Sequence, residues 1–123
     1  MNTPPLKQLL WVASSKRDFK EFPAEVQNNM GRALRDAQFG GTPLHAKPLK
    51  GFIGAGVLEL IEDHDRSTYR AVYTVRFEGV VYVLHAFQKK STHGIATPKH
   101  ELELIRNRYR VAEADYRSRG GRP

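Results

Sequence analysis

The spacing of apolar residues divides the first third of the chain into three segments. Residues 8–12 form a short apolar run that favours a strand. Ser14 and Ser15 follow with hydroxyls able to cap a helix. Pro23 ends that helix and can open a second one, which stops at Gly40. The second helix has apolar residues at 3.6-residue spacing: Val26, Met30, Ala33, Leu34 and Ala37. The pattern predicts a strand followed by a helical hairpin.

The middle of the chain changes from loop composition to strand composition. Residues 42–56 contain two prolines and three glycines, which is typical of a loop. Residues 57–61, 68–77 and 80–88 are rich in β-branched and aromatic residues. The turns between them are expected at residues 63–65 and at Glu78-Gly79. Three strands joined by short turns predict an antiparallel meander.

A last helix is predicted from Thr97-Pro98, because proline favours the first helical position. Its apolar face is a stripe at helical spacing, expected to lie on the sheet or on a partner: Leu102, Ile105, Tyr109, Ala112 and Tyr116. Residues 117–123 have no apolar residue to anchor them and are expected to be a disordered basic tail.

Together these segments predict an α+β fold with the order β-α-α-β-β-β-α. The N-terminal strand should extend the meander, and the helical hairpin should pack on one face. The opposite, concave face should carry any basic site. At 123 residues the chain suits one core, so residues 1–116 are interpreted as a single domain.

The charge balance points to anionic partners. Twenty Lys and Arg against thirteen Asp and Glu give a net charge of +7 and a pI near 9.9. Such a surface favours phosphate-rich partners or an acidic protein, although many soluble proteins are simply basic. No cysteine is present, which excludes disulfides, thiolate metal sites and a cysteine nucleophile. No apolar run approaches the roughly 20 residues of a membrane span, and the N-terminus lacks a signal pattern, so we expect a cytoplasmic protein that does not contact membranes.

Three stretches carry a family resemblance: TYRAVYTV at 68–75, VYVLHAFQKKS at 81–91 and TPKHELELIRNR at 97–108. With the predicted element order, they resemble the RelE/ParE toxin superfamily over residues 9–112, most closely its phage-derived HigB-like branch. The resemblance implies the toxin of a type II toxin-antitoxin system, a ribosome-dependent mRNA endonuclease that inhibits translation without a cofactor. The implied partners are mRNA on the ribosome and a cognate antitoxin, often a helix-turn-helix protein.

Cleaving RNA without a metal requires the 2′-hydroxyl to attack the adjacent phosphate, with cations stabilising the developing charge. Arg70 matches the arginine that RelE-type toxins use on the scissile phosphate, and its planar fork of donors suits two phosphate oxygens. Lys89 and Lys90 fall where the family places a second basic residue. Pairing through the turn at residues 78–79 should bring them near Arg70. The alternative for Arg70 is an ion pair with the acidic turn at residues 62–65. The alternative for Lys89 and Lys90 is that they only lie at a solvated strand end.

Other basic residues are candidates for holding the RNA backbone. Lys47 and Lys50 lie in the Gly/Pro-rich loop, which positions groups poorly for proton transfer. Together with Arg76, they are assigned to RNA binding rather than to chemistry. The alternative for the two lysines is a solubilising loop.

Two histidines are candidate acids or bases. His85 is expected on the same strand face as Val83 and Phe87, which favours a hydrogen-bonded, half-buried histidine over a catalytic one. His93, in a loop just beyond the lysines, is better placed to protonate a leaving group, although an ordinary exposed histidine is the simpler interpretation.

The chain departs from the RelE pattern at two catalytic positions. The first meander strand has Glu59 between Leu58 and Leu60 where those toxins carry lysines, and no tyrosine occurs between Lys90 and Tyr109. The general base is therefore unassigned, and Glu59 can either serve or pair with Arg70.

Two further clusters are interpreted as solvated. The acidic turn at residues 62–65 could suggest a metal, but acidic residues crowded into a turn are usually just hydrated, so no metal is expected. Six arginines between Arg106 and Arg122 either follow RNA phosphates or form a solvated helix surface and tail.

Because the lysines and the tyrosine of the RelE pattern are missing, two functions other than mRNA cleavage are considered. ParE-type relatives share this fold but poison DNA gyrase and cleave nothing. A third possibility is a protein without toxicity that acts only as the partner of a DNA-binding antitoxin.

Overall fold

The predicted α+β order is confirmed, with one additional strand. The computed structural model describes residues 5–52, 54–89 and 97–122. Lys90 and His93 therefore lie outside the described residues. The elements are β1 (Gln8–Trp11), α1 (Ser15–Lys20), α2 (Ala24–Gln38), β2 (Ala46–Pro48), β3 (Val57–His64), β4 (Ser67–Thr74), β5 (Val80–Lys89) and α3 (Lys99–Ser118).

The strands form one sheet in the order β1-β5-β4-β3-β2. The antiparallel meander β3-β4-β5 is as predicted, and β1 extends it by pairing in parallel with β5. The strand that the sequence missed is β2, in the segment predicted as loop. It is a three-residue edge strand containing Pro48, too short for an alternating apolar pattern. Because β2 pairs with β3, Lys47 lies opposite Glu59 in a strand and not in a flexible loop.

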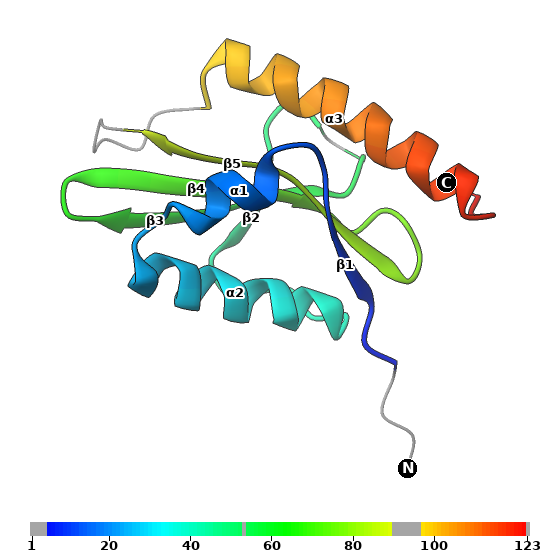
Figure 1. Cartoon of the computed structure of the whole chain (residues 1–123), viewed down its shortest axis with the longest axis horizontal. Coiled ribbons are helices and arrows are strands. Elements are labelled where there is room, and N and C mark those ends of the chain that lie inside the picture. Colours follow the sequence, from blue (N-terminus) through cyan, green and yellow to red (C-terminus); the bar gives the residue numbers. More distant parts are fainter. Residues whose placement is uncertain (1–4, 53, 90–96, 123) are drawn as a thin grey trace.

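Helices cover both faces of the sheet (Figure 1). The hairpin of α1 and α2 packs on one face, where Phe19, Val26 and Leu34 meet side chains such as Tyr73 and Val83. The helix α3 packs on the other face through Ile105 and Ala112. This explains why β4 and most of β5 are buried on both sides, and why β5 is apolar along most of its length.

The turn between β3 and β4 lies two residues later than predicted. Asp65 and Arg66 both have positive φ, 48° and 67°, between the paired residues His64 and Ser67. A two-residue turn with this backbone matches the twist of an antiparallel hairpin. The strand β3 therefore includes most of the acidic segment that the sequence analysis assigned to the turn.

A β-bulge in β5 separates His85 from Val83, whereas Phe87 shares its face as predicted. Val72 pairs with His85, but Tyr73 pairs with Val83, so Leu84 is an extra residue on β5. A bulge interrupts the alternation of side chains between faces. Val83 consequently packs toward the hairpin, whereas His85 stacks on Phe87 with ring centroids 4.9 Å apart, on the side of α3.

The end of the chain is also more ordered than predicted. The helix α3 continues to Ser118, two residues past the expected end, and Arg119 hydrogen-bonds Asp115 at 2.7 Å. The first part of the expected tail is therefore corrected to helix. Within the described residues, no helix has both the length and the apolar character needed to cross a membrane.

Candidate functional site

A pocket of about 840 Å³ opens on the face of the sheet that α3 only partly covers. Its walls come from β2, β3, β4, the segments on both sides of β2 and the start of α3. The residues that line it are Leu44, His45, Lys47, Pro48, Leu49, Lys50, Gly51, Glu59, Ile61, Asp63, Thr68, Arg70, Thr97 and Leu102. This set includes four of the candidate residues predicted from sequence.

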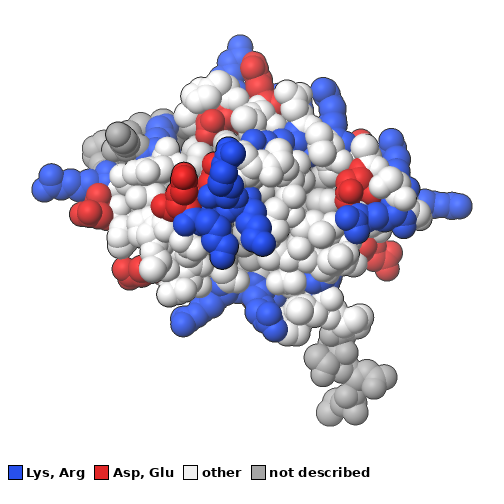
Figure 2. Space-filling view, viewed as in Figure 1, with Lys and Arg blue, Asp and Glu red and all other residues white. Residues whose placement is uncertain are grey.

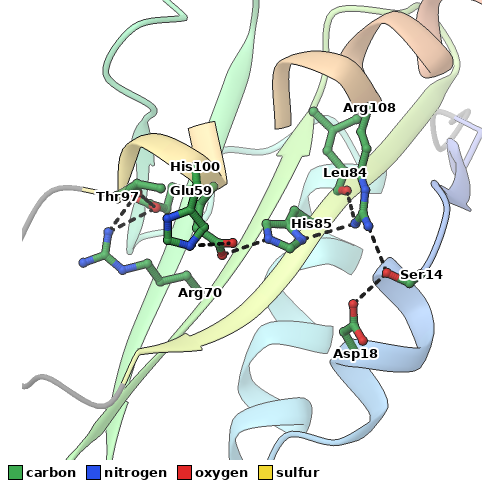
Figure 3. A network of polar contacts seen from close by, with 10 residues as sticks. Ser14, Asp18, Glu59, Arg70, Leu84, His85, Thr97, His100 and Arg108 are labelled. Atoms are coloured by element: carbon green, nitrogen blue, oxygen red, sulfur yellow. Dashed lines mark hydrogen bonds and ion pairs between the residues drawn. The ribbon is translucent and has the colours of Figure 1, made fainter. Parts of the chain in front are cut away.

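Arg70 lies buried in this pocket, with only 3% of its surface exposed. Its Nη1 donates to Oε2 of Glu59 at 3.2 Å and to Oγ1 of Thr97 at 3.0 Å (Figure 3). The Thr97 hydroxyl in turn donates to the same Glu59 oxygen at 2.6 Å. Arg70 thus forms a buried ion pair with Glu59, one of the two roles that the sequence left open for this carboxylate, and not with the acidic turn.

Basic groups stand at the mouth of the pocket. Lys47 and Lys50 are exposed and line it from β2 and the loop that follows. His45 is exposed beside them, and sequence reasoning missed it. Its position next to a predicted basic loop was the only available signal.

The strand β5 brings Lys89 to the same region. Lys89 pairs with Thr68 and Phe87 pairs with Arg70, so Lys89 and Arg70 are diagonal neighbours on one face of the sheet. Arg76, by contrast, follows the far end of β4. It lies six positions after Arg70, or roughly 20 Å along an extended chain, and it does not line the pocket.

A second polar network surrounds His85 (Figure 3). The imidazole Nε2 lies 3.0 Å from Glu101, and Nδ1 lies 3.2 Å from Nη1 of Arg108. Arg108 also donates to the carbonyl of Leu84 at 3.0 Å and to the hydroxyl of Ser14 at 2.9 Å. The network therefore connects β5 and α3 to the beginning of α1.

These contacts set the protonation state of His85. A guanidinium can only donate, so Nδ1 accepts its hydrogen bond and Nε2 carries the proton donated to Glu101. Burial lowers the pKa of His85 below the usual 6.5, although Glu101 acts in the opposite direction. His85 lines a separate pocket of about 270 Å³ and not the Arg70 pocket. Its contacts are those of the hydrogen-bonded, buried histidine that the sequence favoured over a catalytic role.

The acidic segment considered for a metal is divided between the two faces of β3. Glu62 accepts a hydrogen bond from Asn29 on the hairpin side, whereas Asp63 accepts one from Thr68 on the pocket side. Alternation along a strand explains the separation. Across the part of the chain that the structure describes, no group of three or more His, Asp or Glu is placed to hold a metal ion.

The surface charge is distributed over several patches. Figure 2 shows the most prominent group of basic side chains in this view over α1, with acidic side chains close to it. The exposed residues there are Lys16, Arg17 and Lys20. The positive charge is therefore not confined to the Arg70 pocket.

Comparison with known proteins identifies a family but no individual relative. No curated protein matches the chain, and no solved structure matches it either. The model of the family described as phage derived protein Gp49-like (DUF891) matches residues 17–110. That match covers the last four residues of α1, all of α2, all of the meander and the first part of α3, including every residue that lines the Arg70 pocket. The chain therefore belongs to the phage-derived Gp49-like family.

Proposed function

We propose that this protein is the HigB-like toxin of a type II toxin-antitoxin pair and cleaves mRNA on the ribosome. The observation that carries the proposal is the Arg70 pocket, in which a buried arginine lies below two exposed lysines. Membership of a phage-derived family and the resemblance of residues 68–108 to the RelE/ParE toxins support it. A cognate antitoxin, of the helix-turn-helix type, would neutralise the toxin.

The chemistry requires no metal. The 2′-oxygen attacks phosphorus and the bond to the 5′-oxygen breaks, which leaves a 2′,3′-cyclic phosphate and a 5′-hydroxyl. Arg70 stabilises the phosphorane charge, because a guanidinium donates to two oxygens at once. Glu59, in contact with Arg70, is the carboxylate assigned to accept the 2′-hydroxyl proton, and His45 at the mouth supplies a proton to the leaving oxygen. Lys47 and Lys50 hold the flanking phosphates.

A second candidate function is binding without cleavage, as in toxins that poison gyrase. One observation favours it: Glu59 and Thr97 already occupy Nη1 of Arg70. A phosphate reaching Arg70 must therefore compete with a carboxylate in a buried site.

The test is cleavage of a defined mRNA in a purified translation system containing EDTA-treated toxin and the minimal Mg²⁺ that ribosomes need. We expect fragments that end in 2′,3′-cyclic phosphate. Arg70→Lys should reduce the rate about 100-fold or more, because lysine lacks the planar fork. Since a lone Glu59 would be costly to bury, a double variant, Arg70→Met with Glu59→Leu, serves as a folded second test and should also be inactive.

Two other outcomes would contradict cleavage of mRNA by this protein. Intact mRNA together with inhibited gyrase supercoiling would support the binding poison. Intact mRNA and active gyrase, with tight binding to an antitoxin, would indicate a partner without toxicity.

A further inference from the structure

The hydroxyl of Thr97 connects the start of α3 to the floor of the Arg70 pocket. It donates to Glu59 at 2.6 Å and accepts from Arg70 at 3.0 Å, and the residue is only 8% exposed. We propose that Thr97 is a positioning residue that sets the orientation of the Arg70 guanidinium toward the substrate phosphate. The inference rests on the proposed function, since it concerns how the same pocket binds RNA.

The contact with Glu59 does not by itself fix this orientation. It joins one nitrogen of Arg70 to one carboxylate oxygen, at 3.2 Å, and is not the two-pronged arrangement that aligns a guanidinium with a carboxylate. Thr97 gives the same nitrogen a second partner, at 3.0 Å, and the three groups form a closed triangle because the Thr97 hydroxyl also donates to Glu59. Two partners in different directions define the orientation of this nitrogen more narrowly than the Glu59 contact alone.

Thr97 is itself held by the docking of α3. The backbone amides of Glu101 and Leu102 both donate to the carbonyl of Pro98 at 3.0 Å, so the first helical turn begins directly after Thr97. Farther along the helix, Ile105 is completely buried against the sheet. The position of the helix therefore determines where the Thr97 hydroxyl meets Arg70 and Glu59.

Two substitutions distinguish the effect of the Thr97 hydroxyl from the effect of its methyl group. Thr97→Val keeps the shape of the side chain but removes both hydrogen bonds, whereas Thr97→Ser keeps the hydroxyl. The matched control is Thr74→Val on β4. Thr74 is fully buried, and its hydroxyl contacts the carbonyl of Ala55 and the amide of Arg76, outside the Arg70 pocket.

The first measurement is the NMR spectrum of the Arg70 guanidinium in the full-length protein, which needs no RNA. We expect distinct, slowly exchanging Nη signals in the wild type, in Thr97→Ser and in Thr74→Val, and averaged signals in Thr97→Val. In parallel, kcat/KM for mRNA cleavage should fall about tenfold in Thr97→Val, the usual scale for a hydrogen bond to a charged group, and recover in Thr97→Ser.

Several outcomes would overturn the inference. One is an Arg70 spectrum in Thr97→Val that matches the wild type. Another is an equal change in the valine and serine variants, which would assign the effect to methyl packing. A changed spectrum with unchanged kcat/KM would show that the orientation does not matter for the substrate. If the wild type cleaves no RNA, the proposed function fails, and the spectra alone decide whether Thr97 orients Arg70.

Discussion

At the scale of single residues, the ion pair between Arg70 and Glu59 limits how the site can be tested. Both side chains are more than nine-tenths buried. Removing one partner leaves an uncompensated buried charge and typically costs about 3–5 kcal/mol of folding free energy. Loss of activity in an alanine variant would therefore not separate chemistry from stability, and substitutions that preserve shape are needed.

Glu59→Gln keeps the shape of the side chain and an oxygen that can accept from Arg70 and Thr97, but it removes the counter-ion of Arg70, so the folded fraction of the variant is measured first. The substitution should slow RNA cleavage about 100-fold, because an amide cannot accept the 2′-hydroxyl proton. The affinity for RNA should not weaken, because the change removes a negative charge beside the bound phosphate. Rapid-quench cleavage and fluorescence anisotropy measure the two quantities.

The matched control is Asp63→Asn, a carboxylate on the same wall that contacts Thr68 and not Arg70. Its cleavage rate should stay near that of the wild type. A Glu59→Gln protein as fast as the control would remove Glu59 from the mechanism.

His85 should make the stability of the protein depend on pH. Because burial lowers its pKa in the folded state, the unfolded chain binds a proton more readily. The contribution to stability is therefore complete above pH about 6.5, the value of an unperturbed imidazole, and is lost as the pH falls toward the lower folded value. Urea unfolding from pH 7.5 to 5 should show a steeper loss for the wild type than for His85→Gln, and equal slopes would contradict this account.

At the scale of elements, the face on which each side chain lies could be predicted only where the strands are regular. The meander, the hairpin and the stripe of α3 followed from periodicity. The bulge at Leu84 did not, because an extra residue in a continuous apolar run leaves no trace in the pattern. His85 was consequently grouped with Val83, which faces the hairpin, as well as with Phe87, which does share its face. The strand β2 was missed because its pairing with β3 comes from tertiary contact and not from local preference.

Arg108 connects three elements, and its removal should loosen them together. Arg108→Met keeps the aliphatic stem but loses the contacts to Ser14, Leu84 and His85. We expect a loss of about 2 kcal/mol in the free energy of unfolding. The control is Arg110→Met, an exposed arginine on the same helix, which should change stability by less than about 0.5 kcal/mol. Denaturant titrations of both variants measure the difference, and similar losses would mean that the network contributes little.

At the scale of the whole molecule, the sequence predicted which residues meet better than how they meet. The turn between β4 and β5 predicted that Lys89 lies near Arg70, and the register of the two strands places them as diagonal neighbours. Glu59, Lys47 and Lys50 were singled out separately, and the structure brings them into one pocket with Arg70. The contacts of Thr97 and the place of His45 depend on how α3 and β2 dock on the sheet. The spacing of apolar residues along the chain does not indicate where these two elements pack on the sheet. Arg76 was grouped with the others by charge alone, and the length of β4 separates it from them.

The central claim is that this pocket cleaves mRNA through Arg70. The most direct measurement is induction of the protein without an antitoxin in a sensitive bacterium, with growth followed and the 5′ ends of cellular mRNA mapped before and after. We predict growth arrest with new 5′ ends inside translated reading frames, and neither effect with an equal amount of folded Arg70→Lys protein. Growth arrest without new 5′ ends, or the same cuts with Arg70→Lys, would contradict the account.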